Sequence, residues 1–285
     1  MDLSGHSGCI VKLLDGPKGH FVRKKSTNID YNKRLQLQFE KQKTMKIQGI
    51  NVVPVINYGF EDGLFFFDME YINGCTFAEF LKTCNITILI EYTNKLLEHI
   101  IGNTFDSSAK DSFVKKIDSV SNEIKRNNIV KKNDELQKII QESVRILNDY
   151  SWNYVVKSEC HGDYTLENIM IDNENRLYAI DLLDSFYDSW EIDVAKLLQD
   201  IDLGWSYRFE IIDDNLKIRQ MIMKGTVISK ILSMENGDEI VRSIYYILLL
   251  NVLRIIPYTT DDKTFTFIEK SLTYLCNKIN GELIW

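Results

Sequence analysis

The order of hydrophobic and polar positions along the chain changes character once, near residues 73–75. Before this point, apolar residues form short or alternating runs, separated by turns rich in glycine, proline and asparagine. Such runs are typical of β-strands, because successive side chains of a strand point to opposite faces. After this point, apolar residues recur every three or four positions, as on an amphipathic helix. The pattern predicts an α+β protein, strand-rich over 1–73 and mainly helical over 74–285.

Within the first part, the runs predict two or three strands in 1–25 and two more at 52–56 and 64–71. A turn is expected at Asp15–Gly19, where glycine and proline favour a reversal of the chain. Between these strands, the apolar spacing predicts a helix over 30–47. In the second part, helices are predicted at 77–82, 87–101, 108–125, 134–148, 216–233, 238–256 and 264–279.

One polar stretch in the helical part combines residue types that suit phosphoryl transfer. Asp163 follows His161 by two positions, Asn168 follows Asp163 by five, and Asp181 ends a short apolar run. Phosphoryl transfer requires a carboxylate that accepts the proton of a hydroxyl. A second carboxylate and an amide oxygen suit Mg²⁺ bound to a nucleoside triphosphate. These residues at these spacings indicate a phosphoryl-transfer centre.

At these residues the chain resembles the aminoglycoside phosphotransferase and choline kinase-like small-molecule kinases, which are relatives of the protein kinases. The resemblance rests on His-Gly-Asp-x-x-x-x-Asn at 161–168 and on Ile-Asp at 180–181. It implies a bilobal protein kinase-like fold with a small antiparallel-sheet N-lobe and a mainly helical C-lobe. It also implies Asp163 as the catalytic base, His161 as a support of the catalytic loop, and Asn168 and Asp181 as Mg²⁺ ligands.

The same resemblance implies a strand lysine that holds the α- and β-phosphates of ATP. Val22 and Lys24 share one face of the predicted third strand, which matches a small apolar residue under the adenine followed by the lysine. We therefore expect Lys24 to contact the phosphates, with Arg23 and then Lys25 as alternatives. In the helix at 30–47, an acidic partner would orient this lysine. Glu40 is the interior acidic candidate, and Gln38 is a neutral alternative.

Two further stretches are expected to contact the nucleotide mainly through the backbone. A turn of small residues near the N-terminus would cover the phosphates with Gly5, Ser7 and Gly8. By the same resemblance, Met69 would lie just before the chain crosses between the lobes, and Glu70 and Ile72 would offer a backbone carbonyl and amide to the adenine edge. An aspartate shortly before a helix, Asp193, also matches a family position under the catalytic loop. We favour a helix-capping role for it.

Charge and composition further limit the classes of protein to which the chain could belong. The 285 residues carry a net charge of −7, which argues against a general nucleic-acid binder. The five cysteines show no CxxC spacing, so they are expected to be reduced thiols of a cytoplasmic protein. No signal peptide is evident, and the apolar run at 244–256 is too short to span a bilayer. The second part is the more acidic, which weakly favours a cationic acceptor.

The resulting hypothesis is an ATP- and Mg²⁺-dependent kinase that acts on a hydroxyl of an amino alcohol, an aminoglycoside or a sugar. One alternative is a sugar kinase of a surface-polysaccharide pathway. Another is a kinase-like protein that binds nucleotide without catalysis. A protein kinase is disfavoured, because no Ala-Pro-Glu follows Asp181 and the segment up to Asp193 is short.

Overall fold

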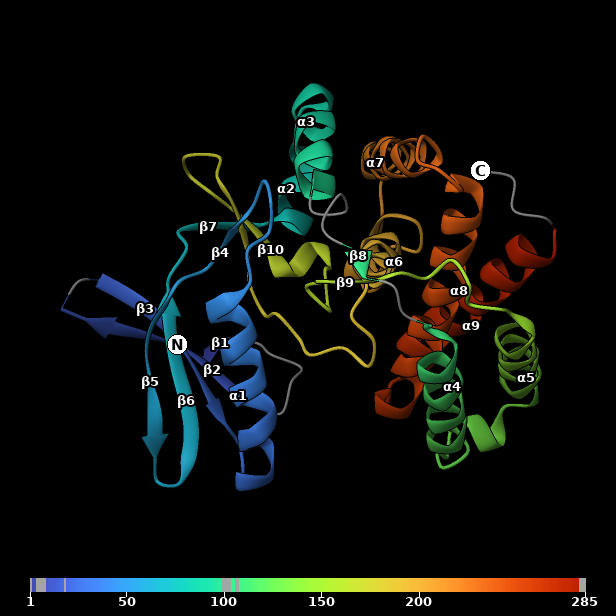
Figure 1. Cartoon of the computed structure of the whole chain (residues 1–285), viewed down its shortest axis with the longest axis horizontal. Coiled ribbons are helices and arrows are strands. Elements are labelled where there is room, and N and C mark those ends of the chain that lie inside the picture. The colour runs from blue at the N-terminus through green and yellow to red at the C-terminus, as the bar shows by residue number, and fades with distance from the viewer. Residues whose placement is uncertain (1, 4–8, 18, 99–103, 106–107, 282–285) are drawn as a thin grey trace. The chain divides into compact units, whose positions relative to one another are not determined.

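The structure, a computed structural model, describes residues 2–3, 9–17, 19–98, 104–105 and 108–281 (Figure 1). The chain divides into two compact units. One comprises Met1–Phe80 and Leu166–Asp184, and the other comprises Leu81–Thr165 and Ser185–Trp285. The sequence-based boundary at residue 73 lies near the first of these divisions. The sequence pattern places 166–184 in the helical part, whereas in the structure this segment belongs to the strand-rich unit.

The first unit contains an antiparallel sheet whose strands, within the described residues, have the order β1-β2-β3-β6-β5. These strands are β1 (Asp2–Leu3), β2 (Cys9–Gly16), β3 (Gly19–Ser26), β6 (Leu64–Glu70) and β5 (Val55–Glu61). The predicted turn between the second and third of these strands is present. Gly16 pairs with Gly19, whose φ of 113° lies in a region that favours glycine.

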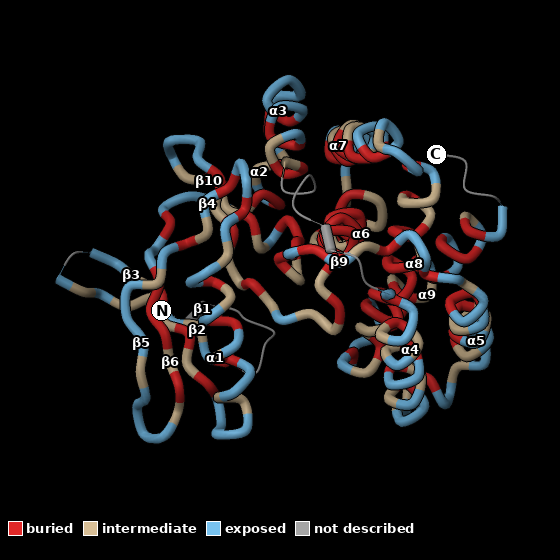
Figure 2. Tube along the Cα trace, viewed as in Figure 1, coloured by how far each residue is buried: buried red, intermediate tan, exposed pale blue. Residues whose placement is uncertain are grey.

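Helix α1 (Ile29–Thr44) packs on this sheet through its apolar face, as Figure 2 shows by burial. Leu35 and Phe39 are buried among the strand residues Phe65 and Phe67. Asn28 caps the helix, since its side chain accepts a hydrogen bond from the backbone N–H of Tyr31. The predicted helix at 30–47 is therefore confirmed, apart from its last residues.

A second, smaller sheet brings the motif segment into the same unit. Within the described residues its order is β4 (Asn51–Val52), β11 (Leu177–Ala179), β10 (Ile169–Asp172) and β7 (Gly74–Thr76). β10 and β11 form an antiparallel hairpin, and β7 pairs with β10. A Cβ on Gly74 would lie 1.9 Å from the carbonyl oxygen of Ile171, so this close strand approach requires glycine.

The second unit is mainly helical, and its longest helices follow the predicted ranges closely. Helices α6 and α8 are buried along most of their length and form its core (Figure 2). The part of the predicted helix 87–101 that lies beyond residue 98 falls outside the described residues. The helices are α2 (Phe77–Thr83, which begins in the first unit), α3 (Ile86–Leu97), α4 (Lys110–Ile124), α5 (Asp134–Asp149), α6 (Trp190–Ile201), α7 (Asp214–Leu232), α8 (Gly237–Ile255) and α9 (Asp262–Asn280). A short strand pair, β8 (Thr104–Phe105) and β9 (Lys157–Ser158), completes it.

Among the described residues, the stretch Gly237–Tyr258 is long and apolar enough to cross a bilayer by length and composition. It includes the whole of α8, and 67% of its most apolar window is buried inside the protein. A buried core helix meets the same criteria, and α8 packs against α6 and α9.

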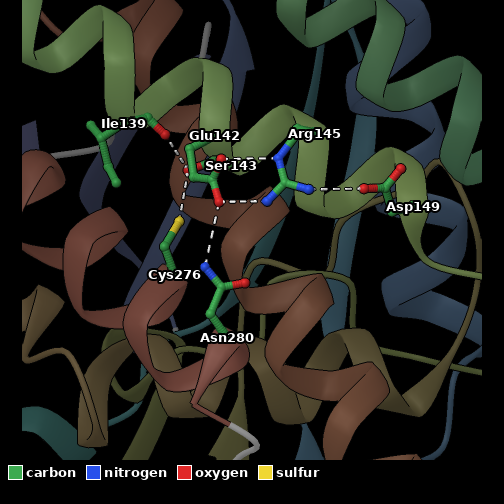
Figure 3. Close-up of polar contacts among 7 residues, drawn as sticks. All are labelled: Ile139, Glu142, Ser143, Arg145, Asp149, Cys276 and Asn280. Carbon is green, nitrogen blue, oxygen red and sulfur yellow. Dashed lines mark hydrogen bonds and ion pairs between the residues drawn. The ribbon is translucent and has the colours of Figure 1, made fainter.

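Polar contacts fasten the C-terminal helix α9 to α5 (Figure 3). The Ser143 hydroxyl lies 3.3 Å from the Cys276 thiol, and Asn280 donates a hydrogen bond of 3.4 Å to Glu142. Glu142 also forms a bidentate ion pair with Arg145, one turn along the same helix. These hydrogen bonds therefore stabilise the packing of α9 against α5.

Candidate active site

The hairpin of β10 and β11 brings two motif residues to one end. Asn168 closes a short 3₁₀ helix, η3 (Leu166–Asn168), directly before β10, and Asp181 follows β11 by two positions. The backbone N–H of Ile180 donates a hydrogen bond of 3.0 Å to the carbonyl oxygen of Asn168, so the hairpin pairing continues up to this end. Asp181 has a φ of 58°, a left-handed conformation that costs most residues roughly 1–2 kcal/mol. Such strain is typical of sites where the backbone aims a functional side chain.

Lys24 on β3 reaches Asp181. Its Nζ lies 2.6 Å from Asp181 Oδ1 and 3.5 Å from Oε1 of Gln38 on α1. The lysine side chain is 3% exposed and that of Asp181 is 31% exposed, so the ion pair is largely shielded from water on the lysine side. A buried ammonium requires such a partner, because desolvation of an unpaired charge is costly.

The neighbouring cations of β3 are engaged elsewhere. Arg23 forms a bidentate pair with Asp68 at 2.7 and 2.9 Å, and this contact raises the pKa of the guanidinium. Lys25 lies 2.6 Å from Glu61. Of the three candidates for phosphate contact, Lys24 is the one that the structure brings to Asp181.

Helix α1 presents Gln38, rather than Glu40, to the strand lysine. Gln38 is buried and its amide oxygen faces Lys24, whereas Glu40 is exposed. From the sequence, its acidic side chain favours Glu40. Gln38 contacts the lysine instead, because the helical repeat places it on the buried face of α1 together with Leu35 and Gln42. One turn further, Lys41 donates a hydrogen bond of 2.6 Å to the carbonyl oxygen of Leu183 and so anchors the segment after Asp181.

The expected adenine contacts lie at the end of β6. Met69 is buried and pairs with Val22 of β3, and Ile72 is buried in the same apolar cluster. Glu70 is exposed, and its backbone N–H donates to the carbonyl oxygen of Pro54. The remaining expected nucleotide contacts lie outside the described residues, namely Gly5, Ser7 and Gly8.

In the second unit, hydrogen bonds to α6 fix the loop that contains His161 and Asp163. The Asp193 carboxylate accepts hydrogen bonds from the backbone N–H groups of His161 at 2.6 Å and Gly162 at 2.8 Å. Gly162 has a φ of 89°, which favours glycine at this bend. The capping role favoured for Asp193 is wrong, because Ser189 caps α6 and Asp193 lies inside its first turn.

His161 is fully buried, and its Nδ1 accepts a hydrogen bond of 3.2 Å from the backbone N–H of Asp163. Tyr164 is buried beside it and donates to the carbonyl oxygen of Leu96 at 3.1 Å. These contacts fix the loop on both sides of Asp163. They fit a supporting role for His161 better than a role as an exposed proton acceptor.

The Asp163 carboxylate has a cationic partner that lies outside the sequence motif. Lys196 Nζ on α6 lies 3.0 Å from Asp163 Oδ1, with the two side chains 15% and 26% exposed. Burial alone would raise the pKa of Asp163. The ammonium of Lys196, with smaller contributions from His161 and Arg254, more than offsets this and lowers the pKa. Asp163 is therefore ionised at neutral pH. The available signal was the spacing, since Asp193 and Lys196 are three residues apart on one helix face.

The donor set of the first unit fits Mg²⁺. Asn168 supplies an amide oxygen, and Asp181 supplies a carboxylate that remains partly exposed. Mg²⁺ commonly takes only one or two protein oxygens, and phosphates and water complete its shell. No cluster of three or more His, Cys, Asp or Glu suited to a metal occurs among the described residues, and such a shell needs none.

Comparisons with known proteins identify the fold. No protein-family model and no curated protein sequence matches this chain. Solved structures do. One is a thermostable mutant of aminoglycoside phosphotransferase APH(4)-Ia in ternary complex with AMP-PNP and hygromycin B. It has a TM-score of 0.65 at 11% identity, over 97% of this chain and 92% of that chain.

Two further structures extend the likeness. Aminoglycoside phosphotransferase APH(3'')-Id from Streptomyces rimosus has a TM-score of 0.58 at 14% identity, over 89% of this chain and 92% of that one. A putative fructosamine-3-kinase from Haemophilus somnus has a TM-score of 0.52 at 15% identity, over 96% and 90%. At these identities the likeness shows the fold. The predicted α+β, protein kinase-like fold is thereby confirmed.

Proposed function

We propose that this protein transfers the γ-phosphoryl group of ATP to a hydroxyl of a small molecule. The observation that carries the proposal is the contact between buried Lys24 and Asp181, at the hairpin end that also bears Asn168. An ammonium, a carboxylate and an amide oxygen at one place are the groups that hold a metal-bound triphosphate. Structural neighbours crystallised with AMP-PNP or ADP support the choice of nucleotide.

In this proposal, Lys24 binds the α- and β-phosphates, and Gln38 orients its ammonium. Asn168 and Asp181 hold Mg²⁺, which would neutralise the charge of the phosphates. The apolar cluster that contains Val22, Met69 and Ile72 would pack against the adenine. Gly5, Ser7 and Gly8 remain candidates for the phosphate cover.

Asp163 is proposed as the group that accepts the proton of the acceptor hydroxyl. It is ionised at neutral pH, and its loop is fixed by His161 and Asp193. Because the transition state of phosphoryl transfer is loose, orientation of the hydroxyl matters more than a strongly basic acceptor. A partner-stabilised carboxylate on a rigid loop suits that role.

We also propose a cytoplasmic location, where ATP is available. None of the five cysteines, all of which the structure describes, forms a disulfide, and four of them are buried, which fits a reducing compartment.

The test is release of ADP from Mg-ATP in the presence of amino alcohols, aminoglycosides, sugars and glycated amines. Wild-type protein should release ADP with at least one acceptor class. Asp181→Asn should abolish this and weaken Mg²⁺-dependent nucleotide binding, because it removes the charged ligand while asparagine tolerates the left-handed backbone. Undiminished Mg²⁺-dependent binding by Asp181→Asn would contradict the assigned role.

A further inference from the structure

Helix α6 supplies two charged side chains to the loop that carries Asp163. Asp193 binds the backbone N–H groups of His161 and Gly162, and Lys196, one turn later, binds the Asp163 carboxylate. Residues three apart on a helix share a face. One face of α6 therefore fixes both the backbone of the loop and the side chain that the proposed reaction uses.

The contact between Lys196 and Asp163 differs from an ordinary surface ion pair. Both side chains are mostly shielded, at 15% and 26% exposure, so their attraction is less screened than between solvated groups. Lys196 also extends from a helix that is buried along most of its length, so its backbone is rigid. A flexible lysine on the surface would lose more side-chain entropy to make the same contact.

The surroundings of Asp163 carry further positive charge. Arg254 on α8 also favours the ionised carboxylate. Asp193 is the nearby acid, and its oxygens are engaged by the two backbone N–H groups. Lys196 is the cation in direct contact with the carboxylate, so it dominates this environment.

We propose that Lys196 is a positioning residue of the acceptor step, which holds the Asp163 carboxylate in place and in its ionised form. The inference rests on the proposed function and assigns a residue that the motif alone does not contain. The geometry favours orientation over basicity, because a lysine at 3.0 Å weakens the proton affinity of the carboxylate while restraining its rotation.

Substitution of Lys196 by an uncharged residue removes the charge that offsets the effect of burial on the pKa of Asp163. In Lys196→Met, burial acts on Asp163 without its main opposing charge, so the pKa of the carboxyl rises. The shift expected for loss of one adjacent opposite charge is about 1–3 pH units. The acid limb of kcat/KM for the acceptor should move to higher pH by this amount, while KM for Mg-ATP changes less than about twofold, because the proposed phosphate contacts lie elsewhere.

The experiment compares wild type, Lys196→Met and Lys196→Arg, with Lys217→Met as an exposed control on α7. Arginine keeps the charge and should restore the wild-type acid limb, and the control should match wild type. A purely structural lysine would alter stability and leave the pH profile in place. Superimposable profiles for folded Lys196→Met and wild type would overturn the proposal.

A second readout is independent of turnover. The ¹³C carboxyl signal of Asp163, assigned by its loss in Asp163→Asn, is titrated in wild type and in Lys196→Met, or in Lys196→Gln if the former does not fold. A higher midpoint in the lysine variant supports the proposal, and equal midpoints overturn it. A raised midpoint together with no ADP release on any acceptor would keep the role of Lys196 in ionising Asp163 and refute the kinase function.

Discussion

The ammonium of Lys24 lies 2.6 Å from the carboxylate of Asp181, although the two residues are 157 positions apart in the chain. The fold creates this contact by adding the β10–β11 hairpin to the unit that contains β3. The group proposed to hold phosphates and the group proposed to hold Mg²⁺ thus neutralise each other. Binding of a metal–nucleotide complex would replace this pair with ligand charges of the matching signs, so neither charge would be left uncompensated.

The two helix candidates for orienting Lys24 can be separated by matched substitutions. Gln38→Ala removes the amide oxygen at 3.5 Å and should raise KM for Mg-ATP by about 2–10-fold, the value of one modest hydrogen bond. Glu40→Ala should leave KM unchanged, because Glu40 is exposed. Steady-state kinetics at varied ATP would decide, and a larger effect from Glu40→Ala would reverse the assignment.

Asp193 should be important for both stability and turnover. Asp193→Asn replaces one of two acceptor oxygens with a donor that faces a backbone N–H, so we expect a loss of about 1.5–3 kcal/mol in the free energy of unfolding. Turnover should fall while Mg-ATP binding survives, because the proposed nucleotide contacts belong to the other unit. Urea unfolding and calorimetry provide the measurements. Asp184→Asn, a change at an exposed position nine residues earlier in the chain, is the control, and equal stability of the two variants would disprove the role.

Glu191 should make the stability of the protein depend on pH. It is fully buried, one oxygen accepts from the backbone N–H of Val156 at 3.0 Å, and the other has no partner among the described residues. Burial raises its pKa well above the usual value, so the native protein keeps a proton that the unfolded chain releases above about pH 4.3. The contribution of Glu191 to the free energy of unfolding is therefore fully present below that pH. It is lost as the pH rises toward the pKa that Glu191 has in the folded protein.

Glu191→Gln removes this titration. Its stability relative to wild type should increase with pH, by at most about 1.4 kcal/mol per pH unit, when denaturant unfolding is followed from pH 5 to pH 8. The matched control is Glu174→Gln, an exposed position in the β10–β11 turn. A difference between Glu191→Gln and wild type that stays constant across this range would contradict a protonated native Glu191.

The charge around Asp163 predicts a preference among acceptors. Lys196 and Arg254 both act on this carboxylate, so a cationic group placed close to the reacting hydroxyl is repelled. We expect higher kcat/KM for an uncharged sugar than for its amino analogue when the amine is adjacent to the phosphorylated hydroxyl. The comparison is made at one pH with matched pairs. A consistent preference for the amino sugar would favour the weak indication from the acidic composition instead.

Much of the fold was predictable from periodicity. The helices α4, α5, α7, α8 and α9 and the strand β6 match apolar patterns that are local and strong, whereas the strand predicted at 52–56 overlaps β4 and β5 only at its ends. The motif at 161–168 was equally local. In contrast, nothing in the local pattern shows that 166–184 joins the strand-rich unit, because strand pairing between β4, β11, β10 and β7 is a long-range relationship.

The errors in the site have a common origin. Glu40 was preferred over Gln38 for its charge, yet the helical register points Gln38 toward Lys24. Asp193 precedes an apolar helical run, which suggests capping, yet Ser189 caps the helix earlier and the Asp193 carboxylate binds the loop. In each case the three-dimensional packing, rather than the residue type, selects the partner.

The most direct test of the proposed mechanism is Asp163→Asn, assayed for acceptor-dependent ADP release and for Mg-ATP affinity in the same preparation. Loss of a positioned proton acceptor should lower kcat by about 10²–10⁴-fold while the dissociation constant for Mg-ATP stays within about twofold. That result would support Asp163 as the group that receives the acceptor proton. Full turnover in the folded variant would contradict the account at its centre.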